Sequence, residues 1–369
     1  MVCGLQSSLE MRRRWPLDLP VLAFALLLPL GACALDDSAD SGDPGDDSDD
    51  PADDPGSDDP DDPGTEPTAF VTCTALAYTP GEPQGFEHTG NQIVAAGGDP
   101  THHAQDIVVV ADEAASASAI FQYSAFAVDI ADEVVKVSLD TCDGWRDLGE
   151  VKTDDDGRAV AEVGEALPAG VYHIVYEVRA DATLASAYLW SLPIGTHMVL
   201  FDIDGTLTTA DTELWKEILL GDYVPEAYPS AAALTAAHAD RGYIPIYLTG
   251  RPNTLNATSR AWLDDLDFAH GVVHTTDHSS QVVPTDSGVG AYKRDFIGSL
   301  MDAGLSIDVA YGNASTDIFA YLSAGLPAYG VWIIGSHGGE EGTHAVDGSW
   351  TARAAEVASA PPIEQPFTR

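Results

Sequence analysis

Basic residues are scarce in this sequence. Its 369 residues include 16 lysines and arginines against 59 aspartates and glutamates, a formal net charge of −43 at pH 7. Proteins bind the phosphate backbone of nucleic acids through lysine and arginine, so this balance argues against nucleic acid as a partner. A phosphate-bearing ligand would need a cation to approach so acidic a surface.

A membrane-spanning apolar run is missing near the start of the chain. The apolar run there, residues 21–28, is too short to cross a bilayer core of roughly 30 Å as a helix. Three arginines precede it and Leu30-Gly31-Ala32-Cys33 follow it, which is typical of a signal peptide at residues 1–33. The last four residues resemble a bacterial lipobox, and this resemblance implies a lipid on Cys33; the alternative is an ordinary cleaved signal. We therefore expect an exported protein of the bacterial cell envelope, lipid-anchored at the outer membrane or the periplasmic face.

Residues 34–68 lack the composition needed for a folded core. They are built mainly from Asp, Pro, Gly and Ser, with 15 acidic residues and no basic ones between Asp36 and Glu66. Such a segment cannot bury enough apolar surface to fold, and its charges repel one another. We expect a disordered acidic linker.

Residues 69–195 show short runs of strand-forming residues separated by turn residues. Candidate strands are residues 107–111, 119–126, 134–139, 158–163, 171–179 and 186–192. This spacing favours an antiparallel β-sandwich of immunoglobulin-like type. Cysteines are few, and the two in this region, Cys73 and Cys142, form either a disulfide or two free buried thiols. No catalytic constellation is evident here, so the expected role is to support or orient the domain that follows.

Strands and helices alternate in residues 196–360, before a tail at residues 361–369. Candidate strands are residues 198–203, 244–248, 271–274, 308–311 and 329–334, and candidate helices are residues 230–241, 253–266, 291–303 and 315–324. This alternation predicts an α/β fold, with a parallel sheet covered by helices on both faces. The join to the first domain is short, so we expect the two domains to pack together.

Two aspartates follow the apolar run that opens this second domain. Asp202 and Asp204 share one face of an extended segment and project past the end of the strand, where open α/β sheets hold their sites. Gly205 permits a sharp turn, and Thr206 offers a hydroxyl and a backbone N–H to an anion. Two close carboxylates indicate a divalent cation, a shared proton, or both. An EF-hand calcium loop is excluded because its sixth residue should be glycine and is Leu207.

Four motifs in this domain carry a family resemblance. They are Phe201-Asp-Ile-Asp-Gly-Thr-Leu-Thr208, Tyr247-Leu-Thr-Gly-Arg-Pro252, Lys293 and Tyr311-Gly-Asn-Ala-Ser-Thr-Asp317. They resemble the motifs of haloacid-dehalogenase-type phosphohydrolases. More narrowly, the region resembles the catalytic domain of lipins, which are phosphatidate phosphatases, and the C-terminal domain of membrane-associated phosphatidylinositol transfer proteins. The resemblance implies a Rossmann-like three-layer fold. Only 46 residues separate Asp202 from Thr249 and 43 separate Thr249 from Lys293, which leaves room for no more than a minimal cap.

The resemblance also implies a role for each polar residue. Asp202 would attack phosphorus, and Asp204 would protonate the leaving oxygen and then deprotonate water. Thr249 would hydrogen-bond the phosphoryl group, and Lys293 would neutralise its charge. Taken singly, Thr249 also fits a helix cap and Lys293 a solvated side chain; the ordered set favours a site.

Two further residue sets follow from the same resemblance. A Mg²⁺ ion would be held by Asp202, Asp204, Asn313 and Asp317. The substrate would lie against Gly205, Thr206, Gly250 and Arg251, although an ordinary surface ion pair is an equal alternative for Arg251.

These observations lead to one main hypothesis and two alternatives. The main hypothesis is a phosphoric monoester hydrolase that uses Mg²⁺ and an aspartyl-phosphate intermediate, with phosphatidate as the favoured substrate. One alternative keeps the mechanism and makes the substrate a soluble phosphomonoester. The other is a phosphatidate-binding module without catalysis.

Overall fold

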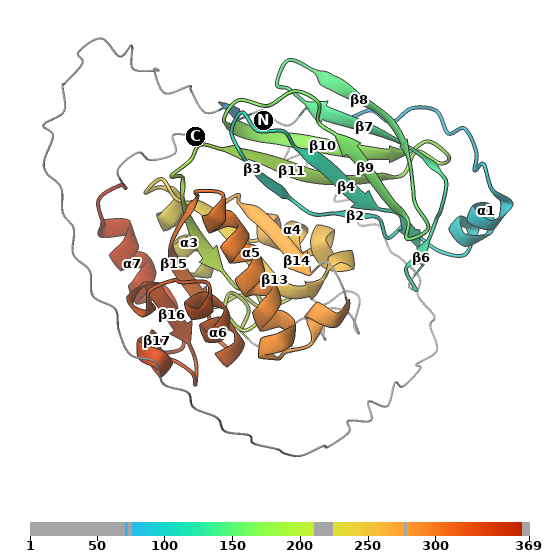
Figure 1. Cartoon of the computed structure of the whole chain (residues 1–369). Helices are drawn as coiled ribbons and strands as arrows, with labels where there is room; N and C mark the ends of the chain where they lie inside the picture. Colours follow the sequence, from blue (N-terminus) through green and yellow to red (C-terminus); the bar gives the residue numbers. More distant parts are fainter. Residues whose placement is uncertain (1–70, 73–75, 125, 210–223, 277–278, 364–369) are drawn as a thin grey trace, which may run out of the picture. The chain divides into compact units, whose positions relative to one another are not determined.

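The computed structural model describes residues 71–72, 76–124, 126–209, 224–276 and 279–363 (Figure 1). All of them belong to one compact unit, Gly64–Arg369. The expected signal peptide, Cys33, the acidic linker, Cys73 and the end of the expected tail lie outside the described residues. Cys142 is disulfide-bonded.

The first domain consists of β-strands in two main sheets. One sheet has the order β3 (Ile107–Val110), β11 (Leu184–Leu192), β10 (Gly170–Val178), β7 (Val134–Asp140) and β8 (Trp145–Lys152), with β1 (Val71–Thr72) also paired to β10. The other has the order β2 (His103–Ala104), β4 (Ser116–Ile120) and β9 (Arg158–Glu162). Phe121, Leu139, Ile174 and Leu189 belong to one buried core in this domain. These residues form a β-sandwich domain, as predicted.

The sandwich differs from the prediction in three details. Two of its pairs, β3 with β11 and β1 with β10, are parallel. Only strands joined by a tight turn are forced to run antiparallel, and neither pair is joined in that way. The predicted strand at residues 119–126 divides into β4 and the short β5 (Gln122–Tyr123), which forms a hairpin with β6 (Val128–Asp129). The strand β8 and the helix α1 (Thr89–Ala96) were not predicted.

The second domain is built on a six-stranded parallel sheet. Its order is β14 (Val272–Thr276), β13 (Ile244–Pro252), β12 (His197–Phe201), β15 (Ser306–Gly312), β16 (Val331–Ile334) and β17 (His344–Val346). The helices α3 (Ala231–Ala239), α4 (Asn256–Asp265) and α7 (Thr351–Ser359) contribute to one core, and α5 (Ala291–Asp302) and α6 (Ser315–Ser323) to another. Figure 1 shows α3 beside α7 and α5 beside α6. The sequence missed β17 and α7.

The central strand β12 is buried on both faces. Met198 and Leu200 pack into the core that contains α5 and α6, whereas Val199 and Phe201 pack into the core that contains α3, α4 and α7. This alternation follows from the two-residue period of a strand, and burial of each large side chain stabilises the fold by roughly 1.5–3 kcal/mol. The strand's position in the middle of the sheet fixes where the residues that follow it lie.

The two domains share apolar contacts. Val171, Trp190 and Leu192 of the sandwich belong to the same buried cluster as Met198 and Leu200. The short connection between β11 and β12 therefore joins packed domains, as expected. Within the described part of the chain, no helix combines the length and the apolar character needed to cross a membrane.

Candidate functional site

The candidate site lies where the chain leaves β12. The carbonyl of Ile203 accepts hydrogen bonds from the backbone N–H groups of Leu207 and Thr208 at 2.8 and 3.0 Å, so the chain turns back at once. Gly205 has φ +74°, a conformation that favours glycine, and its N–H donates to the Thr208 hydroxyl at 2.9 Å. This tight loop holds both predicted aspartates at the carboxyl end of the central strand.

Asp202, Lys293 and Asp317 form a buried charged cluster. Lys293 Nζ, from α5, donates to Asp202 Oδ1 at 2.6 Å and to Asp317 Oδ1, from α6, at 2.7 Å. The three residues are 4%, 2% and 1% exposed. Two carboxylates and one ammonium leave one negative charge in excess. Three residues that lie 115 positions apart at their extremes thus meet at one point, as the motifs predicted.

The electrostatics of this cluster follow from its burial. Burial raises the pKa of Asp202 to about 7; Lys293 opposes this shift, while Asp317 and Asp204 add to it. Burial acts to lower the pKa of Lys293, but the carboxylates of Asp202 and Asp317 outweigh it, so that pKa lies above its ordinary value. Lys293 is therefore charged, and with the pKa of Asp202 near 7 the excess negative charge is complete only above neutral pH.

Asp317 also fixes the loop between β15 and α6. Its Oδ2 accepts hydrogen bonds from the backbone N–H groups of Asn313 and Ala314 at 3.0 and 3.1 Å. The loop passes so close that a Cβ on Gly312 would lie 2.7 Å from the Asp317 Cβ. Both oxygens of Asp317 are thus engaged, one by Lys293 and one by the backbone.

The donor set fits a hard divalent cation in its chemistry. The Thr206 hydroxyl lies 3.0 Å from Asp202 Oδ2 and 3.2 Å from Asn313 Oδ1, so these two oxygens lie on either side of one hydroxyl. All the candidate ligands are oxygens, which Mg²⁺ prefers, and the excess negative charge of the cluster favours a cation. Asp202 and Asp317 are buried and accept hydrogen bonds on both oxygens, whereas Asn313 is partly exposed.

Arg251 does not lie where its predicted role requires. Strand β13 continues to Pro252, beyond the predicted end at residue 248, so Thr249 and Arg251 point to the same face and Gly250 to the other. The Arg251 side chain is fully buried and donates to both oxygens of Asp204, each at 2.9 Å, and to the Ser259 hydroxyl. Arg251 thus holds Asp204 and does not reach outward to a phosphate.

Thr249 and Gly250 have different surroundings. The Thr249 hydroxyl donates to Asp204 Oδ2 at 3.3 Å and accepts from the Arg251 backbone N–H at 3.2 Å. A Cβ on Gly250 would lie 3.0 Å from Val289, so glycine there permits close packing. Gly250 is not among the residues that line the pocket described next.

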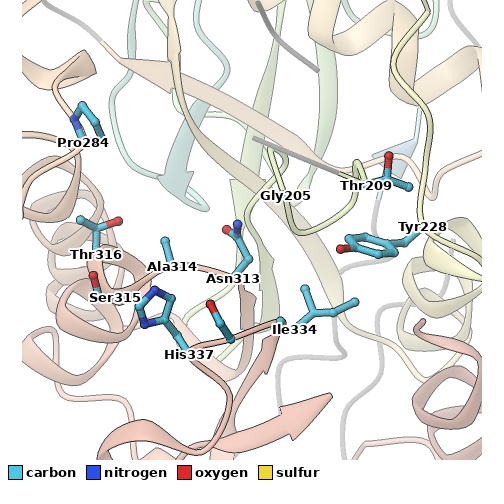
Figure 2. Close-up of a pocket in the computed structure, with 12 residues that line it drawn as sticks. Gly205, Thr209, Tyr228, Pro284, Asn313, Ala314, Ser315, Thr316, Ile334 and His337 are labelled. Atoms are coloured by element: carbon cyan, nitrogen blue, oxygen red, sulfur yellow. The ribbon is translucent and has the colours of Figure 1, made fainter. Parts of the chain in front are cut away.

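A pocket of about 470 Å³ lies beside the loop that follows β12, and Asp202, Lys293 and Asp317 are not among its lining residues. Figure 2 shows Thr209 and Tyr228 on one side of it and Ser315, Thr316 and His337 on the other. Its lining also includes two predicted residues, Gly205 and Asn313. Asn313 connects the pocket to Asp202 through the Thr206 hydroxyl.

Sequence reasoning missed most of this lining. Ser315 and Thr316 lie inside the fourth motif, so their position at the start of α6 was an available signal. Tyr228 precedes α3, and His337 follows β16 in a glycine-rich loop. Nothing in the sequence around those two residues indicates a site.

Comparisons with known proteins agree with both domains. Residues 199–335 match the family model of the LNS2 domain of PITM 1-3, and residues 100–191 match that of the PITM 1-3 beta-sandwich domain. The chain is 29% identical to Protein retinal degeneration B of Drosophila melanogaster over 244 residues. The matched region is 64% of this chain and 18% of that protein.

Two human relatives give similar values. Membrane-associated phosphatidylinositol transfer protein 3 is 27% identical over 194 residues, covering 52% of this chain and 18% of its own length. Membrane-associated phosphatidylinositol transfer protein 1 is 28% identical over 266 residues, which is 70% of this chain and 20% of the length of that protein. The chain spans about a fifth of the length of these curated relatives.

These relatives correct one expectation. They are proteins of Drosophila melanogaster and Homo sapiens, and the two human proteins are named as membrane-associated, so the expected location in a bacterial envelope is wrong. The four-residue lipobox resemblance was too short a pattern to outweigh alignments over whole domains, and nothing supports a lipid on Cys33. Residues 100–191 and 199–335 are thus homologous to the beta-sandwich and LNS2 domains of the membrane-associated phosphatidylinositol transfer proteins.

Proposed function

We propose that this chain is a Mg²⁺-dependent phosphohydrolase that acts on a phosphomonoester, with phosphatidate as the favoured substrate. One observation carries the proposal: Asp202 is held by Lys293 at the end of the central strand, and the Thr206 hydroxyl links it to Asn313, which lines a pocket. The resemblance of the four motifs to haloacid-dehalogenase-type phosphohydrolases supports the same chemistry.

In the proposed reaction each step uses a residue of this cluster. An oxygen of Asp202 forms a bond to phosphorus as the bond to the ester oxygen breaks, and Asp204 gives that oxygen a proton. Water then attacks phosphorus and passes a proton to Asp204, and the bond to Asp202 breaks. Lys293 holds Asp202 in the attacking orientation, and Thr249 orients Asp204.

A magnesium ion would be held by Asp202 and Asn313, with the backbone carbonyl of Asp204 and the carboxylate of Asp317 as further candidates. When bound, it would supply positive charge that offsets the negative charges of phosphate and cluster. The acidic composition of the chain makes such compensation necessary for any phosphate ligand.

The preference for a lipid phosphate has two supports. The homologous proteins are named for phosphatidylinositol transfer, so phospholipid is the ligand class that their names indicate. The described residues between Thr249 and Lys293 form only α4, β14 and short helical segments, which provide no separate cap over the pocket. Without a cap from these described residues, the pocket admits the head of a bulky molecule that remains in a membrane.

Phosphate release from vesicles tests the proposal. Phosphatidate vesicles are incubated with the full chain and Mg²⁺, and Asp202→Asn is compared with Asp308→Asn, which removes a carboxylate that pairs with His197 outside the cluster. We expect release by the wild type and by Asp308→Asn, and none by Asp202→Asn or without Mg²⁺. Equal release by wild type and Asp202→Asn would refute the proposal. Hydrolysis of small soluble phosphomonoesters, without hydrolysis of phosphatidate in vesicles, would show that the substrate is a soluble phosphomonoester.

A binding module without catalysis is the second candidate, and one observation favours it. Arg251 donates to both oxygens of Asp204 and Thr249 donates to Oδ2, so a proton passed to a leaving group has to use the remaining lone pair of Oδ1. Vesicle flotation separates the candidates. Binding to phosphatidate vesicles that survives Asp202→Asn, together with no phosphate release by the wild type, would favour this second function.

A further inference from the structure

The edge strand β14 of the parallel sheet is covered by side chains of the other domain. It pairs with β13 on one side only. In a strand the N–H and C=O groups of alternate residues point to opposite sides, so Val273 and Thr275 direct theirs away from β13. An open edge of this kind needs partners.

Two consecutive residues of the sandwich, Gln105 and Asp106, supply them. Gln105 Nε2 donates to the carbonyl of Thr275 at 2.6 Å, and its Oε1 accepts from the Thr275 backbone N–H at 3.1 Å. The amide thus pairs with the strand as a further strand would. Asp106 Oδ2 accepts from the Val273 backbone N–H at 2.9 Å, and its Oδ1 accepts from the Tyr188 N–H at 2.9 Å.

The same two side chains also hold the helix α4. Asn256 donates to Gln105 Oε1 at 2.9 Å, and Arg260 donates to Asp106 Oδ2. Gln105 and Asp106, which lie between β2 and β3, therefore make hydrogen bonds to both α4 and β14.

Both α4 and β14 also contact Arg251. From β14, the Thr276 hydroxyl donates to the Arg251 carbonyl at 3.2 Å, and Gln105 Nε2 lies 3.4 Å from the Thr276 carbonyl. From α4, the Ser259 hydroxyl accepts from the Arg251 guanidinium at 3.1 Å. The guanidinium in turn holds both oxygens of Asp204. The backbone and the side chain of Arg251 are thus fixed by β14 and α4, which the sandwich domain holds in place.

We propose that Gln105 and Asp106 are positioning residues for Asp204, so that the sandwich domain sets the geometry of the phosphate site. The role of Asp204 in turnover rests on the proposed function; the mechanical link from Gln105 to Arg251 does not. A group displaced by about 1 Å reduces catalysis by as much as ~100-fold, so a small shift of Arg251 is enough for a measurable effect.

The test compares two glutamines of the sandwich in the full chain. Gln105→Met keeps the volume and removes the amide. Gln122→Met is the matched control, because Gln122 is half-buried and its amide donates to Asp129 within the sandwich. We expect Gln105→Met to lower kcat on a phosphomonoester at least ~10-fold with KM within about threefold, because Asp204 acts in the chemical step. The kcat of Gln122→Met stays within about twofold of wild type. Equal kcat values for the two variants would overturn the proposal.

A second readout keeps the test independent of turnover. The Arg251 Nε–H proton, which is bonded to Asp204, is followed by NMR exchange with water. We expect exchange at least ~10-fold faster in Gln105→Met than in wild type or Gln122→Met. Unchanged exchange in Gln105→Met would overturn the positioning role. If wild type releases no phosphate, the proposed function fails, and this measurement alone decides the inference.

Discussion

Lys293→Met provides the sharpest test of the buried cluster. Among the described residues, Lys293 makes the only ion pairs with Asp202 and with Asp317, at 2.6 and 2.7 Å. Methionine has a similar length and no charge, so the variant leaves two almost fully buried carboxylates without a cation. Removing one partner of a buried pair costs roughly 3–5 kcal/mol, because the remaining charge is left without compensation.

The loss is measured by urea unfolding and by thermal unfolding at pH 7.5 in metal-free buffer. At an unfolding entropy of ~2.1 cal/mol/K per residue, a free-energy loss of this size lowers the thermal midpoint by roughly 5–9 °C for a folded region of about 270 residues. The matched control is Lys136→Met on β7, whose nearest carboxylate oxygen, on the exposed Asp147, is 3.8 Å away. Such a pair contributes no more than about 1 kcal/mol.

Two further conditions identify the cause of the loss. Acid should restore part of the stability of Lys293→Met, because protonation of one carboxyl removes a buried charge. Mg²⁺ should also restore stability if the oxygens of Asp202 and Asn313 hold a cation. A Lys293→Met chain that is within about 1 kcal/mol of wild type at pH 7.5 without metal would refute the reasoning.

Two other predictions concern the same cluster. Because burial raises the pKa of Asp202 from 3.8 to about 7, the folded chain keeps a proton that the unfolded chain loses between these values. The free energy of unfolding should therefore fall as pH rises from about 4 to 7, by at most about 4 kcal/mol. Asp202→Asn should lack this part of the slope in metal-free urea titrations, and equal slopes would contradict it. Gly312→Ala should cost roughly 1–3 kcal/mol, because its Cβ would lie 2.7 Å from that of Asp317. The control Gly298→Ala, with open space around it in α5, should be neutral or slightly stabilising, and equal losses in both variants would contradict the argument.

The sequence predicted best those parts that local pattern determines. The apolar run of β12 lies between two cores, and its composition alone indicated a buried strand. The pattern placed Asp202 at the carboxyl end of a parallel strand. The resemblance of the four motifs implied that Lys293 and Asp317 lie beside it. Topology, rather than any local signal, brings them within hydrogen-bond distance.

The elements that were missed have little apolar pattern. Strand β8 and helix α1 have no fully buried residue, and β17 has only three residues, none of them buried. Hydrophobic periodicity reports burial, so an element that lies on the surface and is held by backbone hydrogen bonds leaves no such signal. Helix α7 was missed because only Ala354 and Val357 of its residues are buried.

Arg251 and Gln105 have side-chain partners that could not be predicted from the sequence. Thr-Gly-Arg-Pro has the composition of a turn, yet β13 continues through it and turns Arg251 inward to a partner 47 positions away. Gln105 finds its partner Thr275 at a separation of 170 residues, across a domain boundary. Neither pairing has a local sequence signal, so a single sequence without structure could not assign either role.

Metal dependence by itself cannot separate hydrolysis from binding in this protein. Among the described residues that line the pocket, only His337 has a side chain able to carry a positive charge. A phosphate entering the pocket meets hydroxyl and backbone donors at the start of α6, and it approaches the buried cluster, whose excess charge is negative above neutral pH. Coulomb repulsion therefore opposes the ligand whether or not a reaction follows, and a divalent cation offsets it in both cases. Loss of activity or of vesicle binding on chelation is expected under either function. The covalent role of Asp202 is specific to one of them, so phosphate release by Asp202→Asn against wild type is the comparison that decides.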